Sequence, residues 1–191
     1  MKFKFLFLIL FVISSGYSQR FKILEGELEN LKNINSFNAE FNYENIEVHG
    51  FKSEEEFLKE KMEKRNADPG KAEEFRANWF SNREKYYNPA FIDYFNKYFK
   101  NQECKIASEA AHLMKVNLTW IYTGYAVEPA KLSTVIDFYD VNNPSKKLLS
   151  IQFDKVIGLE KKMIAVNEHD RIIGAFEKLA KNLAIQLKRF H

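Results

Sequence analysis

Polar and apolar residues alternate strictly in four segments of the chain, a pattern that predicts half-buried β-strands. The first segment runs from Phe37 to Tyr43. The other three follow one another, separated by links that contain turn signals, and comprise residues 111–123, 132–139 and 149–154. Three successive strands joined by short links predict an antiparallel meander.

Between the first strand and the meander, apolar residues recur at helical spacing and predict three helices. The first covers residues 54–65 and begins with the capping-box sequence Ser53-Glu54-Glu55-Glu56, whose side chains can bond to the free backbone N–H groups of the first turn. The second covers residues 71–85. The third covers residues 88–101, with an asparagine cap and a proline at its first helical position.

The clearest pattern lies near the C-terminus, where apolar residues follow the i, i+3, i+4, i+7 rule from Ile172 to Leu187. This spacing predicts a helix of about twenty residues. Gly174 interrupts it at a cost of about 1 kcal/mol relative to alanine, so we expect a close approach to a neighbouring element there. Residues 158–167 show no period and predict a loop. Residues 20–35 predict an N-terminal lead with one short strand or helical turn.

The order strand, three helices, three strands, helix predicts a single α+β domain from residue 19 to residue 191. In this domain a mainly antiparallel, four-stranded sheet is covered by helices. One face of the sheet is expected to pack against the C-terminal helix. The polar face of the meander is either exposed to solvent or a binding surface.

The first eighteen residues have the pattern of a secretory signal peptide. Two lysines precede nine consecutive apolar residues, Phe5 to Ile13, a run too short to span about 30 Å of hydrocarbon. Gly16 and Ser18 supply small residues for cleavage before Gln19. We therefore expect an exported protein, periplasmic or secreted, with no transmembrane segment after cleavage; an uncleaved membrane anchor is the alternative.

Cleavage would also remove most of the net positive charge. The full chain has 29 lysine and arginine residues and 26 aspartate and glutamate residues, a formal net charge of +3. Loss of Lys2 and Lys4 leaves 27 basic residues against 26 acidic ones, a net charge near +1. A nucleic-acid-binding domain normally carries a strongly basic surface, so we expect no nucleic-acid partner.

The sequence contains none of the common motifs for catalysis or cofactor binding. It has no G-x-S-x-G, H-E-x-x-H, G-x-x-x-x-G-K-[ST], G-x-G-x-x-G or paired C-x-x-C sequence, and we expect no cofactor. Its four histidines are scattered, and Glu168-His169-Asp170 is interpreted as the charged first turn of a helix rather than a metal site. The single cysteine, Cys104, is expected to be a half-buried small residue rather than a nucleophile. We therefore assign no catalytic and no metal-binding residue.

Aromatic residues are concentrated in one part of the chain, with ten of them between residues 75 and 99. Phe91, Phe95 and Phe99 supply the one apolar stripe that a packed helix needs. The remaining amphipathic rings could line a groove for a glycan, a lipid or a peptide. Alternatively, both helices are partly buried and the rings belong to the core. The candidate ligand or partner surface consists of Trp79, Tyr86, Tyr87, Tyr94 and Trp120.

Several segments of this chain resemble small exported proteins of Bacteroidetes-type bacteria. The resemblance rests on the run Trp79-Phe80-Ser81-Asn82-Arg83-Glu84-Lys85-Tyr86, on Pro89-Ala90-Phe91-Ile92 with Phe95-Asn96-Lys97-Tyr98, on the hairpin at Asn142-Asn143-Pro144 and on a final helix at Arg171-Ile172. It implies no biochemical activity, and no functional residue carries over from it. Such proteins commonly have a glycine-rich loop before the last helix, where this chain has Glu160-Lys161-Lys162.

The predicted export, the missing catalytic motifs and the surplus of tyrosine and tryptophan favour a non-enzymatic binding or interaction module. Its partner would be a cell-envelope protein, a glycan or a lipid. The alternative is a small secreted hydrolase, or a small-molecule or lipid carrier, with a pocket between the aromatic helices and the sheet. A third hypothesis is a purely structural envelope protein that self-associates.

Overall fold

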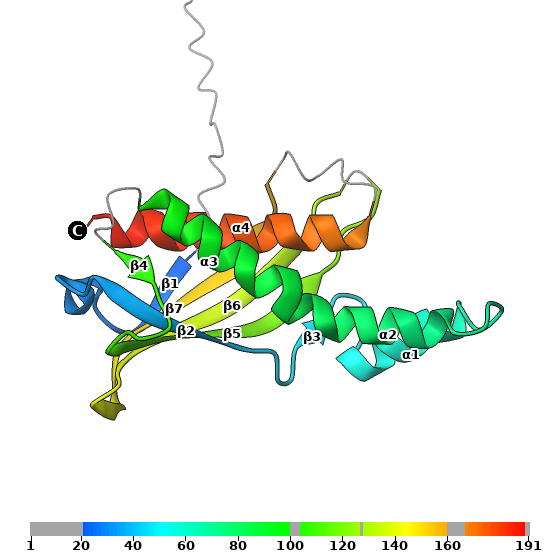
Figure 1. Cartoon of the computed structure of the whole chain (residues 1–191), viewed down its shortest axis with the longest axis horizontal. Helices are drawn as coiled ribbons and strands as arrows, with labels where there is room; N and C mark the ends of the chain where they lie inside the picture. Colours follow the sequence, from blue (N-terminus) through cyan, green and yellow to red (C-terminus); the bar gives the residue numbers. More distant parts are fainter. Residues whose placement is uncertain (1–20, 100–103, 127, 160–166, 190–191) are drawn as a thin grey trace, which may run out of the picture.

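A mixed β-sheet with helices over one face makes up the fold in the computed structural model, which describes residues 21–99, 104–126, 128–159 and 167–189 (Figure 1). The α+β class is thereby confirmed. The strands are β1 (Phe21–Gly26), β2 (Ser36–Asn42), β3 (Glu47–Val48), β4 (Lys105–Ile106), β5 (His112–Tyr122), β6 (Lys131–Asp140) and β7 (Asn143–Ile157). The helices are α1 (Glu54–Glu63), α2 (Lys71–Asn82), α3 (Asn88–Tyr98) and α4 (Glu168–Leu187), with a 3-10 helix η1 (Leu28–Leu31) and a π-helical segment η2 (Arg83–Tyr87).

The sheet has seven strands rather than the four that alternation predicts. Its order is β1-β7-β6-β5-β2-β4, and β3 also pairs with β5. The meander of β5, β6 and β7 is antiparallel as predicted, and β1 adds antiparallel to β7. By contrast, β2 and β3 run parallel to β5, and β4 runs parallel to β2. Alternation could not reveal β3 and β4, because each has only two residues.

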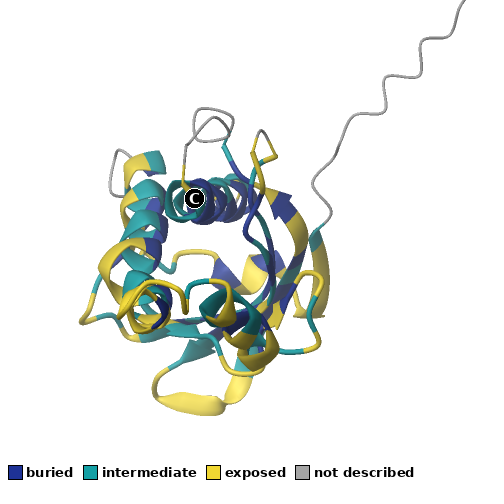
Figure 2. Cartoon of the chain, turned by 90° about the vertical axis from the view of Figure 1, so that its right-hand side faces the viewer, coloured by how far each residue is buried: buried dark blue, intermediate teal, exposed yellow. Residues whose placement is uncertain are grey.

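The parallel pairing of β2 with β5 follows from the helices between them in the chain. Two parallel neighbours need a crossover connection, usually helical, and α1, α2 and α3 provide it. Figure 1 shows α3 and α4 over one face of the sheet, while the opposite face carries no helix among the described residues. Figure 2 shows that the sides of these layers that face one another are buried and the sides that face away are largely exposed.

The predicted break between the second and third helices is wrong, because α2, η2 and α3 form one continuous helical run. Asn88 does not cap a new helix: its dihedral angles are helical, and its Oδ1 accepts a hydrogen bond from the Tyr43 hydroxyl at 2.5 Å. The backbone N–H of Asn88 donates to the Arg83 carbonyl, five residues earlier. Pro89 accounts for this wide turn, since proline lacks an N–H and its ring would clash with the Lys85 carbonyl in a regular α-helix.

The predicted capping box of α1 is confirmed in a modified form. The Glu56 N–H donates to Ser53 Oγ at 3.2 Å, and the Glu56 carboxylate accepts from the backbone N–H of Lys52 at 2.7 Å. At the start of α4, Asn167 Oδ1 accepts from the Asp170 N–H at 2.8 Å. Both caps satisfy N–H groups that have no partner within the helix.

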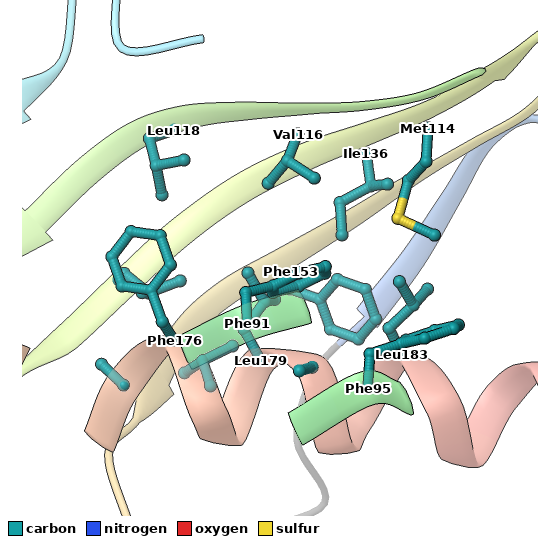
Figure 3. Packing of buried hydrophobic residues seen from close by; sticks show 14 of the residues in the cluster. Phe91, Phe95, Met114, Val116, Leu118, Ile136, Phe153, Phe176, Leu179 and Leu183 are labelled. Carbon is teal, nitrogen blue, oxygen red and sulfur yellow. The ribbon is translucent and has the colours of Figure 1, made fainter. Parts of the chain in front are cut away.

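The centre of the core lies between the sheet and the pair α3 and α4. Figure 3 shows Phe91 and Phe95 of α3 beside Leu179 of α4, on the side that faces Val116 and Ile136 of the sheet. Each of these five side chains is fully buried. Burial of such side chains contributes about 1.5–3 kcal/mol each, so this contact fixes how the two long helices sit on the sheet.

The close approach expected at Gly174 is confirmed. A Cβ atom on Gly158, just after β7, would lie 3.3 Å from the carbonyl carbon of Gly174 and 3.2 Å from the backbone nitrogen of Ala175. The Leu159 N–H donates to the Gly174 carbonyl at 3.1 Å. The chain after β7 therefore crosses α4 directly on its backbone, and a side chain at position 158 would require its neighbours to shift by a few tenths of an ångström.

Two predictions concern segments that the structure does not describe. The predicted signal peptide, residues 1–18, lies outside the described residues, and so do residues 160–166 of the predicted loop. Within the described ranges, no helix has both the length and the apolar composition that a membrane crossing requires.

Candidate functional site

The five residues predicted as a ligand surface lie in three different places. Tyr86 and Tyr94 line one open groove beside α3 and α4. Trp79 and Tyr87 are buried between the helices and the sheet, with 6% and 4% of their surface exposed. Trp120 lies on β5, paired with Glu47 of β3, on the face of the sheet without a described helix. Of the five, the structure thus brings together on an open surface only Tyr86 and Tyr94, whereas Trp79 and Tyr87 meet inside the core.

The groove follows the contact between α3 and α4 and has a volume of about 500 Å³. Tyr86 and Tyr94 border it, Pro89 and Ala90 lie between them, and Ile173 lines it from α4. Residues three or four apart share one face of a helix, so the lining residues of η2 and α3 form a continuous strip. From Tyr86 to Lys97 this strip is about 16 Å long, at roughly 1.5 Å per residue. The groove is therefore elongated, with small and apolar side chains along its middle.

Four charged side chains also line the groove: Lys85, Asp93, Lys97 and Glu177. Two of them are basic and two are acidic, so the rim carries no net charge. A rim of a single sign would select a ligand of the opposite sign. This balanced rim suits a ligand that carries both signs of charge or none.

Tyr86 is oriented by the first turn of α4. Its ring lies edge-on to the ring of His169, with the ring centroids 4.5 Å apart, and 48% of its surface is exposed. His169 also contacts Tyr87, at 5.6 Å between centroids. The two successive tyrosines of η2 therefore both contact one imidazole ring, with Tyr86 in the groove and Tyr87 in the core.

Tyr87 extends the apolar stripe of α3 by one turn. Tyr87, Phe91, Phe95 and Phe99 follow at four-residue intervals, and all four are buried. The ring of Tyr87 stacks on Phe176 of α4, with centroids 5.5 Å apart and an interplanar angle of 17°. Burial raises the pKa of the Tyr87 phenol well above its usual range. Tyr87 therefore supports the helices from inside and presents no surface to a ligand.

Trp79 belongs to a buried polar network that joins α1 to α2. Its indole Nε1 donates to Glu54 Oε1 at 2.7 Å, and the same oxygen accepts from the Arg83 guanidinium. The side chains of Arg83 and Glu54 are 15% and 12% exposed. The Arg83 guanidinium also lies over the ring of Tyr43, 4.5 Å from its centroid, and burial raises the pKa of the Tyr43 phenol. These contacts are structural.

Side chains nearly fill the space between the aromatic helices and the sheet. A cavity of about 10 Å³ remains there, lined by residues that include Trp79, Arg83 and Tyr87 from the helices and Leu118 and Ile121 from β5. This is about the space that one water molecule needs. A lipid or a sugar does not fit into it.

The uncovered face of the sheet carries a second aromatic group around Trp120. The His49 ring lies edge-on to Trp120 and Tyr122, at 5.6 and 5.0 Å between centroids. The ammonium groups of Lys155 and Lys131 lie 5.7 and 5.3 Å from the ring centroids of Trp120 and Tyr122. The rings of this group are therefore already in contact with polar neighbours from β6, β7 and the turn after β3.

The described residues offer little reactive chemistry. Cys104 is fully buried, more than the half-buried position predicted, and burial raises the pKa of its thiol to about 12. A thiol is a nucleophile only as the thiolate, so Cys104 is inert. In the described part of the chain, no group of three histidine, cysteine, aspartate or glutamate side chains is placed to hold a metal ion.

Sequence reasoning did not single out Ile173 and Glu177, which line the groove from α4. It interpreted His169 only as part of the charged first turn of a helix, and not as a contact of Tyr86. The spacing of Ile173 and Glu177, one helical turn apart, indicates that they share a face of α4. It does not indicate which helix that face meets. Only the packing of α3 against α4 brings this face to Tyr86.

Comparisons of the chain with protein-family models, with curated proteins and with solved structures found no match.

Proposed function

We propose that this protein is an exported, non-enzymatic binding module that holds a segment of a partner protein in the groove between α3 and α4. The observation that carries the proposal is the placement of Tyr86 and Tyr94 along one open face, with small residues between them and Ile173 opposite. Tyrosine combines an apolar ring with a polar hydroxyl group and is enriched at protein interfaces. Tyr86 is the better anchor, because His169 already holds its ring in place.

A polypeptide segment fits this groove better than an anionic lipid or an acidic glycan. A length of about 16 Å takes about five residues in extended conformation, at roughly 3.3 Å each. A polypeptide also carries charges of both signs, which match the two lysines and two carboxylates of the rim. An anionic phospholipid or an acidic glycan brings one predominant sign of charge and would match only half of the rim.

We also propose that the protein acts in the periplasm or outside the cell. The support is the pattern of residues 1–18, with two lysines, nine apolar residues and small residues before Gln19. The measurement is the intact mass of the protein recovered from the periplasmic and culture fractions of cells that express the full chain. A mass that begins at Gln19 is expected. Uncleaved protein confined to the cytoplasm would contradict export.

Site-specific photo-crosslinking tests the binding function and locates the partner. A photoreactive amino acid is placed at Asp93, exposed on the groove rim, or at Glu73, which is also exposed but lies in the first turn of α2, outside the groove. Irradiation of intact cells should give a discrete protein adduct from the Asp93 position and not from the Glu73 position. Adding Tyr86→Ala and Tyr94→Ala to the Asp93 variant should abolish the adduct.

Two results would contradict the proposed function. One is the same set of adducts from both positions, which would indicate chance encounters. The other is an Asp93 adduct whose mass identifies a glycan or a lipid instead of a polypeptide.

A further inference from the structure

The two edge strands of the sheet differ in whether their outward backbone polar groups have partners. At the β4 edge, Asn96 of α3 bonds to both backbone polar groups of Ile106, accepting from its N–H at 2.7 Å and donating to its carbonyl at 3.1 Å. At the other edge, β1 pairs with β7 on one side only, and no described strand lies on its outer side. An unpaired edge of this kind is a template for another strand.

The open β1 edge exposes two neighbouring apolar side chains. Ile23 is 38% exposed and Leu24 is 46% exposed, and all residues from Lys22 to Gly26 are solvent-accessible. Natural edge strands are usually kept apart by charges. Here Lys22 and Glu25 flank the apolar pair with opposite charges, which makes the strand complementary to an antiparallel copy of itself.

A bulge places these two charges on the same face of the sheet. Lys22 lies opposite Gln152 and Glu25 opposite Ser150, two residues of β7 that share a face, because the register shifts between Ile23 and Glu25. In a regular strand, residues three apart would point to opposite faces. The Glu25 carboxylate lies 3.6 Å from the Lys147 ammonium, which also contacts Asp137.

We infer that two copies of this chain pair through their β1 strands, antiparallel and about a two-fold axis between Ile23 and Leu24. In this register, Lys22 of one copy lies opposite Glu25 of the partner subunit, and the reverse pair forms on the other side of the axis. Ile23 lies opposite Leu24 of the partner subunit, so the exposed apolar side chains cover one another. Side chains of opposite charge, and apolar side chains, stabilise an antiparallel pair of strands when they face each other directly.

This pairing closes on itself, because each copy uses its single β1 edge and the contact is the same from both sides. The result is a dimer with one continuous sheet rather than a fibre. The inference is independent of the proposed function, since no residue of β1 lines the groove between α3 and α4.

Charge reversal tests the pairing directly. The protein, purified from cells that express the full chain, is studied by sedimentation equilibrium over a wide concentration range, and the wild type should be a reversible dimer. Lys22→Glu and Glu25→Lys each place like charges opposite one another at two symmetric positions and should weaken the dimer by about tenfold or more. The double exchange Lys22→Glu with Glu25→Lys restores both opposite pairs and should recover the dimer.

Lys32→Glu is the matched control, because it reverses an exposed lysine outside β1 and should leave the dimer unchanged. Glu25→Lys also brings a lysine near Lys147, so Lys22→Glu decides the question if Glu25→Lys does not fold. A monomer at every concentration would overturn the inference. So would a dimer that Lys22→Glu does not weaken, or one that the folded double exchange fails to restore.

Discussion

At the scale of single residues, the carboxylate of Glu54 depends on Arg83 for its counter-charge inside the protein. Arg83→Met would leave the Glu54 carboxylate largely buried, with the Trp79 N–H still donating to it but no positive charge from Arg83 beside it. Breaking a buried pair in this way typically costs about 3–5 kcal/mol, and we expect a loss of about 3 kcal/mol in the free energy of unfolding because both side chains keep some exposure. Chemical denaturation measures this loss.

The double variant Glu54→Gln with Arg83→Met is the control for this prediction. It leaves no unpaired buried charge, so it should be more stable than Arg83→Met alone. Equal stability of the two variants would contradict the expected cost of leaving the Glu54 carboxylate without the charge of Arg83.

Glu168, in the first turn of α4, should make stability depend on pH. Burial raises the pKa of its carboxyl above the ordinary 4.5, against the opposing charges of Lys61, Arg171 and Arg65. The folded state therefore binds this proton more tightly than the unfolded state, and the resulting stability is lost as pH rises through the folded pKa. Glu168→Gln replaces the carboxyl with an amide that does not titrate, so this pH-dependent change in stability is absent from the variant.

The expected result is that Glu168→Gln becomes more stable relative to the wild type as pH rises from below 4.5 to neutrality. The free energies of unfolding of both proteins at several pH values provide the comparison. A difference that is independent of pH would mean that the folded protein does not perturb this carboxyl.

At the scale of elements, the start of α4 is fixed by its contact with the connection after β5. Arg171 Nε donates to the Thr123 carbonyl at 3.2 Å, and its Nη2 donates to the Gly124 carbonyl at 3.3 Å. A Cβ atom on Gly124 would lie 2.8 Å from Arg171 Nε and 2.6 Å from the Glu128 carbonyl oxygen. Gly124 is therefore required for space as well as for its φ of +78°.

Gly70 offers a matched comparison, because its φ is +80° and nothing lies within 4 Å of a Cβ atom there. Gly70→Ala should lose about 1 kcal/mol, from backbone strain alone. Gly124→Ala should lose about 3 kcal/mol, because the clash adds to the same strain. Thermal and chemical denaturation of the two variants measure these losses. Equal losses would show that Glu128, Ala130 and Arg171 move away from the added Cβ atom without an energetic cost.

The predictions from sequence succeeded where an element carries its own signal and failed where the signal is tertiary. Alternation located β2, β5, β6 and β7, the capping box located the start of α1, and the charged residues of the first turn indicated the start of α4. β3 and β4 are too short to alternate, and β1 departs from alternation at its bulge. Pro89 was interpreted as a helix start because a π-helical turn, which lets a proline continue a helix, leaves no local mark in the sequence.

At the scale of the whole molecule, the candidate site could be predicted only in part. Tyr86 and Tyr94 were identified as surplus to the apolar stripe, and they share the groove. Tyr87 continues the stripe of Phe91, Phe95 and Phe99 by one turn, a signal that the sequence contains. The burial of Trp79 depends on Glu54, 25 residues away in the chain, and the sequence does not show that contact.

The two surfaces that we propose would act together. A dimer formed through β1 would carry two copies of the groove, since β1 contributes no residue to it. Two linked binding sites raise the apparent affinity for a partner that presents repeated segments, without any new contact. Weak binding at one groove would therefore be sufficient for retention in the cell envelope.

The most direct test of the central claim is the affinity of the segment captured at Asp93 for three purified proteins. These are the wild type, Tyr86→Ala with Tyr94→Ala, and a control with Phe80→Ala and Tyr125→Ala, which removes two rings that are 37% and 77% exposed outside the groove. Calorimetric titration should show binding weakened by about a hundredfold in the groove variant, as for interface anchors of about 2 kcal/mol or more, and unchanged in the control. Equal weakening in both variants, or none in the groove variant, would contradict binding in the groove between α3 and α4.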